Sequence, residues 1–190
     1  MFLTGFAMQL GANDVLLGLM ATIPALFVVF QFAGAYMVEK GFSRKRQTII
    51  FSLATPLCWF LVMTIPFVAK DVSNMAALGV LGGIIALVTV SNQFAGSARG
   101  SWIGELIPAE RRGKFFGYAA MFGGIIGAAF AIGEGKFLDA IKHYGLAAFL
   151  GLFLFGSIFG LVSGFLHMPQ PECPLPGAEA RTPYFETMKR

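Results

Sequence analysis

The sequence predicts an all-α integral membrane protein, and three observations support this fold class. Hydrophobic residues make up 56% of the 190 positions and charged residues only 13%, with a mean hydropathy of +0.72. Soluble domains carry roughly 25% charged residues, and a domain of this length cannot bury so much apolar surface. The apolar residues also form long runs without the alternation of a membrane β-barrel. Helices are the remaining way to satisfy the backbone hydrogen bonds within lipid.

Five runs reach the length of about 20 apolar residues that a transmembrane helix needs. We expect these spans at residues 15–38, 47–69, 75–98, 115–133 and 146–167. Residues 1–12 look like the last part of a further helix and are too short to span alone. Residues 1–168 are therefore predicted to form one transmembrane bundle, followed by a Pro-rich, charged linker at 169–190.

Basic residues are concentrated on one side of the predicted bundle. If the loop at 39–46 is cytoplasmic, the alternation of the spans leaves only Lys70, Lys136 and Lys142 on the other side, so 11 of the 14 Lys and Arg residues are cytoplasmic. This asymmetry is the positive-inside signature. We expect a multi-pass protein of the plasma (inner) membrane with its linker on the cytoplasmic side. Topology also explains the net charge of +4 without nucleic acid as a partner.

Small residues recur at four-residue spacing in the predicted spans. This spacing lets helix backbones approach closely where lipid supplies no hydrophobic drive. We expect helix packing at four such sets: Gly79 and Gly83, Gly96 and Gly100, Gly123 and Gly127, and Gly156, Gly160 and Gly164. Trp102 is expected in the aromatic belt at the membrane interface.

Two loops on the basic side carry more charge than orientation requires. The first, "AYMVEKGFSRKR", places Glu39 at a helix end, then a lysine, a glycine and three clustered bases. The second, "SWIGELIPAERRGKFFG", ends a helix with Glu105, turns at Pro108 and restarts at Gly113 after two arginines. Each loop therefore combines one carboxylate at the membrane edge with several cations.

We expect Glu39 or Glu105 to pair with Arg44, Arg46 or Arg112 across these loops. A partly desolvated ion pair contributes more than an exposed one. A pair of this kind can also be broken and remade between two states, which is how a gate would work.

These loops resemble the major facilitator superfamily. The first loop is similar to the family signature between helices two and three, with its glycine displaced by one residue to Gly34 and a glutamate, Glu39, in place of the usual aspartate. The second is similar to the loop between helices four and five, and the tail resembles the linker between the two six-helix halves. The resemblance covers the whole chain as an amino-terminal half, truncated within the first helix and before the second half.

The resemblance implies secondary active transport of a small solute by alternating access, in which two halves rock around a midplane site. The partners it implies are the solute, membrane lipid and the missing carboxy-terminal half. Glu39 would contact the neighbouring bundle, while Arg44 or its neighbours would hold Glu105. The expected cytoplasmic gate comprises Glu39, Lys40, Arg44, Lys45, Arg46, Glu105, Arg112 and Gly113.

Polar residues within the predicted spans are candidates for binding the solute. Asn92 and Gln93 are unusually polar for a span, and Gln31 lies at a similar depth as a potential partner. Polar residues in spans usually face a cavity or the bundle interior. Arg99 could snorkel to the cytoplasmic edge or pair with an acid. We therefore expect substrate contacts from these four residues, with hydrogen bonding between helices as the alternative.

Other classes of function have less support in the sequence. There is no Gly-x-Ser-Gly tetrad for an intramembrane protease, and no clustered His, Asp or Glu residues for a metal site. We expect no enzyme activity, no cofactor and no metal. The alternative to transport is a truncated, non-transporting fragment or a membrane scaffold that pairs with another subunit.

Overall fold

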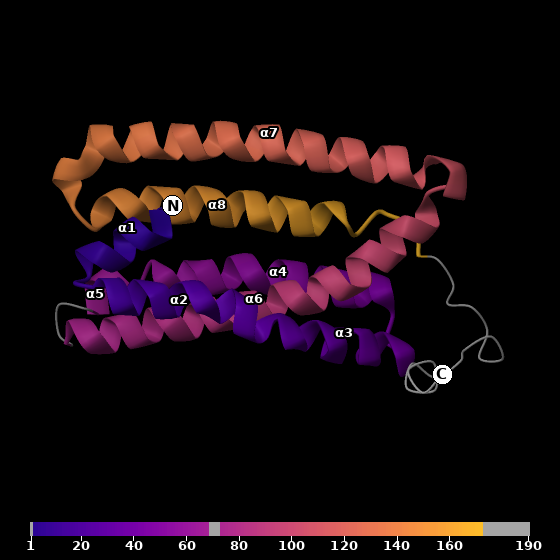
Figure 1. Cartoon of the computed structure of the whole chain (residues 1–190), viewed down its shortest axis with the longest axis horizontal. Helices are drawn as coiled ribbons and strands as arrows, with labels where there is room; N and C mark the ends of the chain where they lie inside the picture. The colour runs from indigo at the N-terminus through magenta and orange to yellow at the C-terminus, as the bar shows by residue number, and fades with distance from the viewer. Residues whose placement is uncertain (1, 69–72, 173–190) are drawn as a thin grey trace.

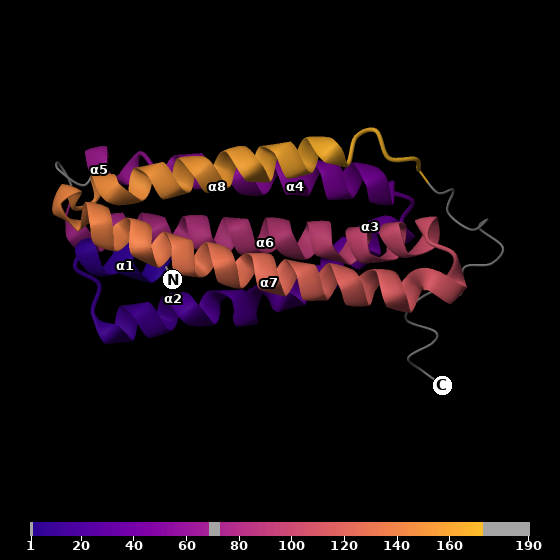
Figure 2. The same ribbon diagram turned by 90° about the horizontal axis from the view of Figure 1, so that it is seen from above.

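The computed structural model describes residues 2–68 and 73–172, and the elements of these residues are helices that run along one axis (Figures 1 and 2). In chain order they are α1 (Phe2–Gln9), α2 (Asp14–Leu26), η1 (Phe27–Val29), α3 (Phe30–Glu39), α4 (Arg44–Val62), α5 (Ile65–Val68), α6 (Asn74–Leu106), α7 (Ala109–Ile141), η2 (Lys142–Tyr144) and α8 (Ala147–Leu166). Helices α4 and α7 begin at the same end of the bundle, which we call the Arg44 end. Helices α2, α6 and α8 begin at the opposite end, which we call the Asn74 end.

The five predicted spans are confirmed as helices long and apolar enough to cross a membrane. They are Asp14–Glu39, Arg44–Phe67, Asn74–Leu106, Ala109–Ile141 and Ala147–Leu166. The expected partial helix at the N-terminus is the eight-residue α1. Most of the predicted linker, residues 173–190, and Lys70 of the predicted outer loop lie outside the described residues.

The second loop was expected to end where a helix restarts at Gly113, and this bound is wrong. Helix α6 continues to Leu106 and α7 already begins at Ala109. Between them Ile107 is extended, with φ −107° and ψ 129°, as the residue before a proline prefers. Hydropathy marks where the charged residues begin, but Ala, Arg and Glu are good helix formers. The backbone therefore stays helical beyond the apolar span, and Pro108 sets the break.

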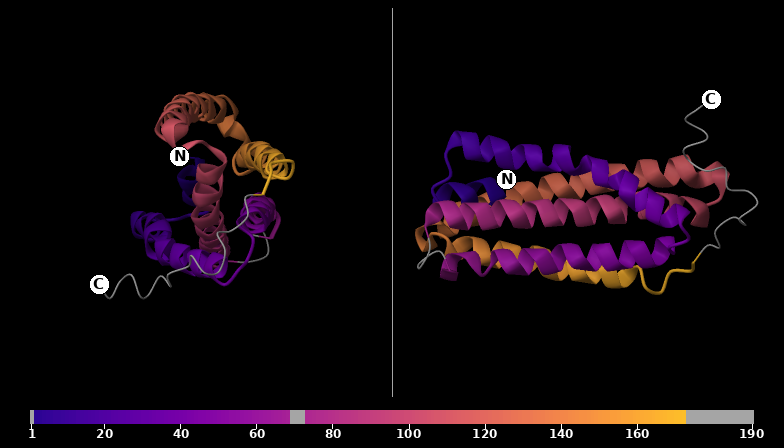
Figure 3. Two further views of the ribbon diagram at one scale, coloured as in Figure 1. Left: turned by 90° about the vertical axis from the view of Figure 1, so that its right-hand side faces the viewer. Right: turned by 90° about the horizontal axis from the view of Figure 1, so that it is seen from below.

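The first span bends between α2 and α3. Pro24 lacks a backbone N–H and cannot donate within the helix, and the chain tightens into the 3-10 turn η1 shortly after it. Figure 3 shows the change of direction between α2 and α3. The bend leaves α3 free to approach the final turns of α6.

The apolar core lies at the Asn74 end, where α1 packs among α4, α5, α6 and α8. Phe6 of α1 is fully buried, with its ring 5.2 Å from that of Phe153 and 5.6 Å from that of Phe149, centroid to centroid. Burying one phenylalanine side chain stabilises a fold by about 1.5–3 kcal/mol. The short α1 is therefore anchored by aromatic packing despite its length.

Helix α6 is central to the bundle, whereas α7 lies at its margin (Figure 3). About 44% of the most apolar stretch of α6 is buried, compared with 0% for α7 and for the span formed by α2 and α3. An apolar helix that its own chain does not cover must be covered by lipid or by other protein. The exposed surface of α7 thus fits a membrane environment.

The predicted packing role of the glycines is confirmed for only two of them. A Cβ at Gly160 would lie 3.0 Å from Cβ of Pro56, and one at Gly164 would lie 3.0 Å from Cγ of Leu53, so α8 meets α4 closely at both. The prediction is wrong for the other seven, where a Cβ would meet no described atom within 4 Å: Gly79, Gly83, Gly96, Gly100, Gly123, Gly127 and Gly156. Small residues permit a close approach, but they do not select the face that a neighbouring helix contacts.

We predict that Gly160→Ala lowers the free energy of unfolding by about 1–3 kcal/mol, because the added methyl group overpacks the rigid ring of Pro56. Gly156→Ala, one turn earlier on the same helix, is the control and should be neutral or mildly stabilising. Thermal unfolding in detergent, followed by circular dichroism, measures both. Equal melting temperatures for the two variants would contradict the close contact between α4 and α8.

Candidate functional site

The loop at 40–43 is built by two local signals in the sequence. Gly41 has φ +97°, a conformation that glycine adopts without strain. It ends α3 in a Schellman motif, with Phe42 N–H donating to the Met37 carbonyl and Gly41 N–H to the Val38 carbonyl, both at 3.0 Å. Ser43 then caps α4 by accepting a hydrogen bond from the backbone N–H of Arg46 at 3.1 Å. The loop therefore delivers Arg44 to the first turn of α4.

Arg44 and Glu105 form a bidentate ion pair between α4 and α6. The Nη1 and Nη2 atoms of Arg44 donate to the two carboxylate oxygens of Glu105 at 2.6 and 2.5 Å. The Arg44 side chain is 7% exposed and that of Glu105 is 37% exposed. This fork geometry is the strongest common form of charge-assisted hydrogen bond. The structure thus forms one of the pairs predicted from the sequence, and its role as a gate stays a prediction.

The other predicted gate residues belong to the same two loops as this pair or to the helix ends beside them. Arg112 is exposed, donates from Nε to the Ile107 carbonyl at 3.0 Å and adds its positive charge to the field at Glu105. Lys40 is exposed, with its ammonium group 5.3 Å from the centroid of the Tyr36 ring. The remaining four are placed as follows: Glu39 is half-buried at the end of α3, Lys45 is half-buried, and Arg46 and Gly113 are exposed.

A buried glutamine that sequence reasoning missed holds three helices together next to the ion pair. Gln47 is 0% exposed. Its Nε2 atom donates to the Gly34 carbonyl at 2.9 Å and to the Phe94 carbonyl at 3.0 Å, and it lies 3.3 Å from Ser97 Oγ. One side chain of α4 therefore bonds to both α3 and α6.

Gly34 allows this arrangement because α3 and α6 meet at it. A Cβ at position 34 would overlap Ser97 Oγ and would lie 3.2 Å from the backbone Cα of Phe94. In the first loop the glycine stands one residue earlier than in the family signature that the loop resembles. The close contact between α3 and α6 is accordingly at Gly34 and not at Ala35. No larger residue fits there without moving one of the two helices.

The polar residues of α4 form a stripe toward α6 and α3. Arg44, Gln47, Thr48 and Thr55 recur at spacings that return to one face of a helix. Arg44, Gln47 and Thr48 are buried, and Thr55 Oγ1 donates to Asn92 Oδ1 at 3.3 Å. The three- and four-residue spacing of these polar side chains is the sequence signal that could have identified Gln47 and Thr55.

The predicted substrate residues do not form one cluster in the described part of the chain. Asn92 is exposed and bonds to Thr55, not to Gln31. Gln31 and Arg99 are exposed and Gln93 is half-buried, and no hydrogen bond to a described residue is formed by any of these three. The pairing of Gln31 with Asn92 or Gln93 is therefore wrong, because Asn92 bonds to Thr55 of α4 and neither Gln31 nor Gln93 bonds to a described residue.

Trp102 does not lie in an interfacial belt. It is 0% exposed, its Nε1 donates to the Pro171 carbonyl at 3.1 Å, and its ring lies edge-on to His167 at 6.0 Å. Ser43 Oγ donates to Glu172 in the same region. The belt prediction is wrong because a carbonyl of the segment after α8 satisfies the indole. That segment folds across the Arg44 end.

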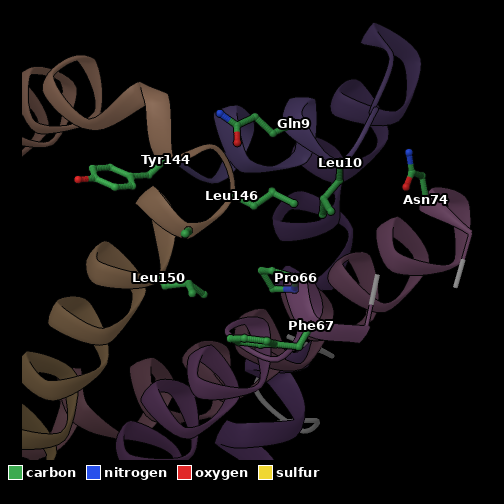
Figure 4. A pocket seen from close by; sticks show the side chains of 9 residues that line it. Gln9, Leu10, Pro66, Phe67, Asn74, Tyr144, Leu146 and Leu150 are labelled. Carbon is green, nitrogen blue, oxygen red and sulfur yellow. The ribbon is translucent and has the colours of Figure 1, made fainter. Parts of the chain in front are cut away.

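Two cavities lie away from the Arg44 end. The first, of about 370 Å³, opens at the Asn74 end between α1, α5, η2 and the beginnings of α6 and α8 (Figure 4). Its floor is apolar, with Pro66, Phe67 and Leu146 among the side chains, and Gln9 and Asn74 lie at its edge. The second, of about 570 Å³, lies between α7 and α8. Neither is lined by any of the four predicted substrate residues.

No protein-family model, curated protein or solved structure matches this chain. Among residues 2–68 and 73–172, no three His, Cys, Asp or Glu side chains are grouped to hold a metal ion. The site is therefore defined by its own geometry: a bidentate ion pair, a buried amide and a polar stripe that together join α3, α4 and α6.

We predict that Gln47→Leu lowers the free energy of unfolding by about 1–3 kcal/mol, because the hydrogen bonds of the Gln47 amide to α3 and α6 are lost inside the bundle. Gln31→Leu, an exposed glutamine on the neighbouring α3, is the matched control and should change little. Thermal unfolding of the purified variants measures both effects. If both substitutions had the same effect, Gln47 would not be the link between α3 and α6.

Proposed function

We propose that this chain forms the amino-terminal six-helix half of a major facilitator carrier, which moves a small solute by secondary active transport with alternating access. The observation that carries the proposal is the bidentate Arg44–Glu105 pair. It joins the two loops whose sequences carry the family resemblance. The proposal assigns no enzyme activity, no cofactor and no nucleic acid to the chain.

The ion pair suits a gate because separating Glu105 from Arg44 costs a large free energy as long as Arg44 stays buried. The Arg44 side chain is almost fully buried, and removing the partner of a buried charge costs about 3–5 kcal/mol. The pair thereby fixes the loop at 40–43 against α6. Glu39, at the end of α3, is then held where a second half can contact it when the cytoplasmic side closes.

The depth and the exposure of two amides on α6, Asn92 and Gln93, support a solute path beside the gate. Asn92 lies 13 positions before Glu105 on α6, about 20 Å along the helix. It therefore sits well inside the bilayer, which has a hydrocarbon core of about 30 Å. Asn92 is exposed and Gln93 is half-buried, so both amides are accessible to a solute at that depth.

The bundle also has surfaces suited to the proposed partners. Helix α7 and the span formed by α2 and α3 are apolar but unburied by the described chain, which leaves them for membrane lipid and a carboxy-terminal half. In this proposal the protein is a multi-pass protein of the plasma (inner) membrane, with the Arg44 end and the linker in the cytoplasm. The same exposed helices favour the alternative, a non-transporting scaffold that pairs with another subunit.

Transport can be tested without knowing the solute in advance. Cells that express the complete reading frame and matched cells that lack it are compared for uptake across a panel of isotope-labelled small solutes. A solute whose uptake depends on the protein is then followed in Glu105→Gln, in Arg44→Gln and in the exchanged variant Arg44→Glu with Glu105→Arg.

We predict that each single substitution lowers uptake at least about tenfold at equal membrane abundance, and that the exchange restores part of it. Arg111→Gln is the control, because this arginine is exposed and does not belong to the expected gate, and it should keep uptake within about twofold. Wild-type uptake in both single variants would exclude the gate. If the panel contains no solute whose uptake depends on the protein, the scaffold alternative is favoured.

A further inference from the structure

Helices α7 and α8 enclose a cleft in the half of the bundle toward the Asn74 end. The cleft has a volume of about 570 Å³. Its walls come from one face of α7 and one face of α8, and they comprise Ala129, Phe130, Gly133, Glu134, Phe137, Gly151, Leu152 and Phe155. Figure 1 shows α7 and α8 side by side over this length.

Glycines hold the cleft open while aromatic rings line it. A Cβ at Gly133 or at Gly151 would meet no described atom within 4 Å, so the space beside these residues is empty of protein. The rings of Phe130 and Phe155 face one another from the two helices, with centroids 6.1 Å apart and planes inclined at 45°. Phe137 adds a third ring two turns after Phe130.

Glu134 places a carboxylate in this aromatic cleft. It is half-buried and forms no ion pair or hydrogen bond with the described residues. It directly follows the apolar stretch at 115–133 of a helix that is long and apolar enough to cross a membrane, and a partly buried carboxylate without a partner charge is costly. Neither the ion pair at the Arg44 end nor the Asn92 region makes use of this residue.

We propose that the α7–α8 cleft binds an amphipathic organic cation, with its ammonium group at Glu134 and its apolar body among the three phenylalanines. A carboxylate supplies the counter-charge, and aromatic faces attract a cation placed within about 6 Å of their centroids. The volume suits a small ligand, since ligand sites typically measure about 300–1,000 Å³. This binding site does not depend on the proposed transport function.

The charge of the walls favours a simple cation over a zwitterionic phospholipid. The residues that line the cleft include one acid and no base. A phosphodiester next to the ammonium group would therefore meet no partner charge and would lie near the Glu134 carboxylate. A monocation with an aromatic or alkyl body leaves no charge unpaired.

Photolabelling of the purified chain tests this site. The protein is placed in nanodiscs of phosphatidylglycerol, which contain no ammonium group, and is labelled with an aryl-trimethylammonium probe that carries a diazirine. Peptide mass spectrometry locates the label. The competitors are phenyltrimethylammonium and its uncharged isostere tert-butylbenzene.

We expect labelling at residues 129–137 and 151–155 that phenyltrimethylammonium prevents and tert-butylbenzene does not. Glu134→Gln should reduce the labelling about tenfold, and Gly151→Leu should do the same by filling the cleft. Asp139→Asn is the matched control, because Asp139 is exposed on the same helix and does not line the cleft. Circular dichroism verifies that each variant remains folded.

Three results would overturn the proposal. Equal labelling of Glu134→Gln and Asp139→Asn would show that the carboxylate does not bind the cation. Full competition by tert-butylbenzene would show a purely apolar groove. Loss of labelling in nanodiscs of phosphatidylethanolamine or phosphatidylcholine would assign the cleft to a lipid headgroup.

Discussion

The contact of α4 with α6 at the Arg44 end depends on a guanidinium group that is buried and must be paired. Arg44 is almost inaccessible to solvent, and both of its Nη atoms are directed at Glu105. One turn further along α4, the amide of Gln47 bonds to α3 and α6 together. Because an unpaired buried polar group costs far more than a pair contributes, these two side chains determine how the three helices meet.

The two ends of the bundle are stabilised by different chemistry. At the Asn74 end the core is apolar, with Phe6 of α1 packed on the aromatic rings of α8. At the Arg44 end the contacts are an ion pair, a buried amide and a carbonyl that accepts from Trp102. The hydrogen bonds and the ion pair at the Arg44 end can be exchanged for other polar contacts when helices move, whereas an apolar core loses contact area when it opens. In a carrier, this difference would place the moving part at the Arg44 end.

The sequence was sufficient for the helical class and the five spans, because apolar length is a local feature. Charged residues at helix ends predicted an ion pair between the two loops, but left open which of Glu39 and Glu105 pairs with Arg44, Arg46 or Arg112; the structure forms the pair between Arg44 and Glu105. The sequence failed where the answer depends on which helices are neighbours. Asn92 bonds to Thr55 and not to Gln31, and seven of the nine glycines in small-residue repeats have no close neighbour among the described residues. Trp102 is covered by a segment nearly 70 positions away along the chain, and no local pattern contains that information.

The central claim is that the Arg44–Glu105 pair holds the beginning of α4 against the end of α6. Double electron–electron resonance between spin labels at Arg46→Cys and Gly100→Cys, with Cys58 and Cys173 replaced by serine, measures this separation directly. The account predicts one narrow distance with Glu105 intact and an added population at longer distance in Glu105→Gln. Superimposable distance distributions in the two proteins would contradict it.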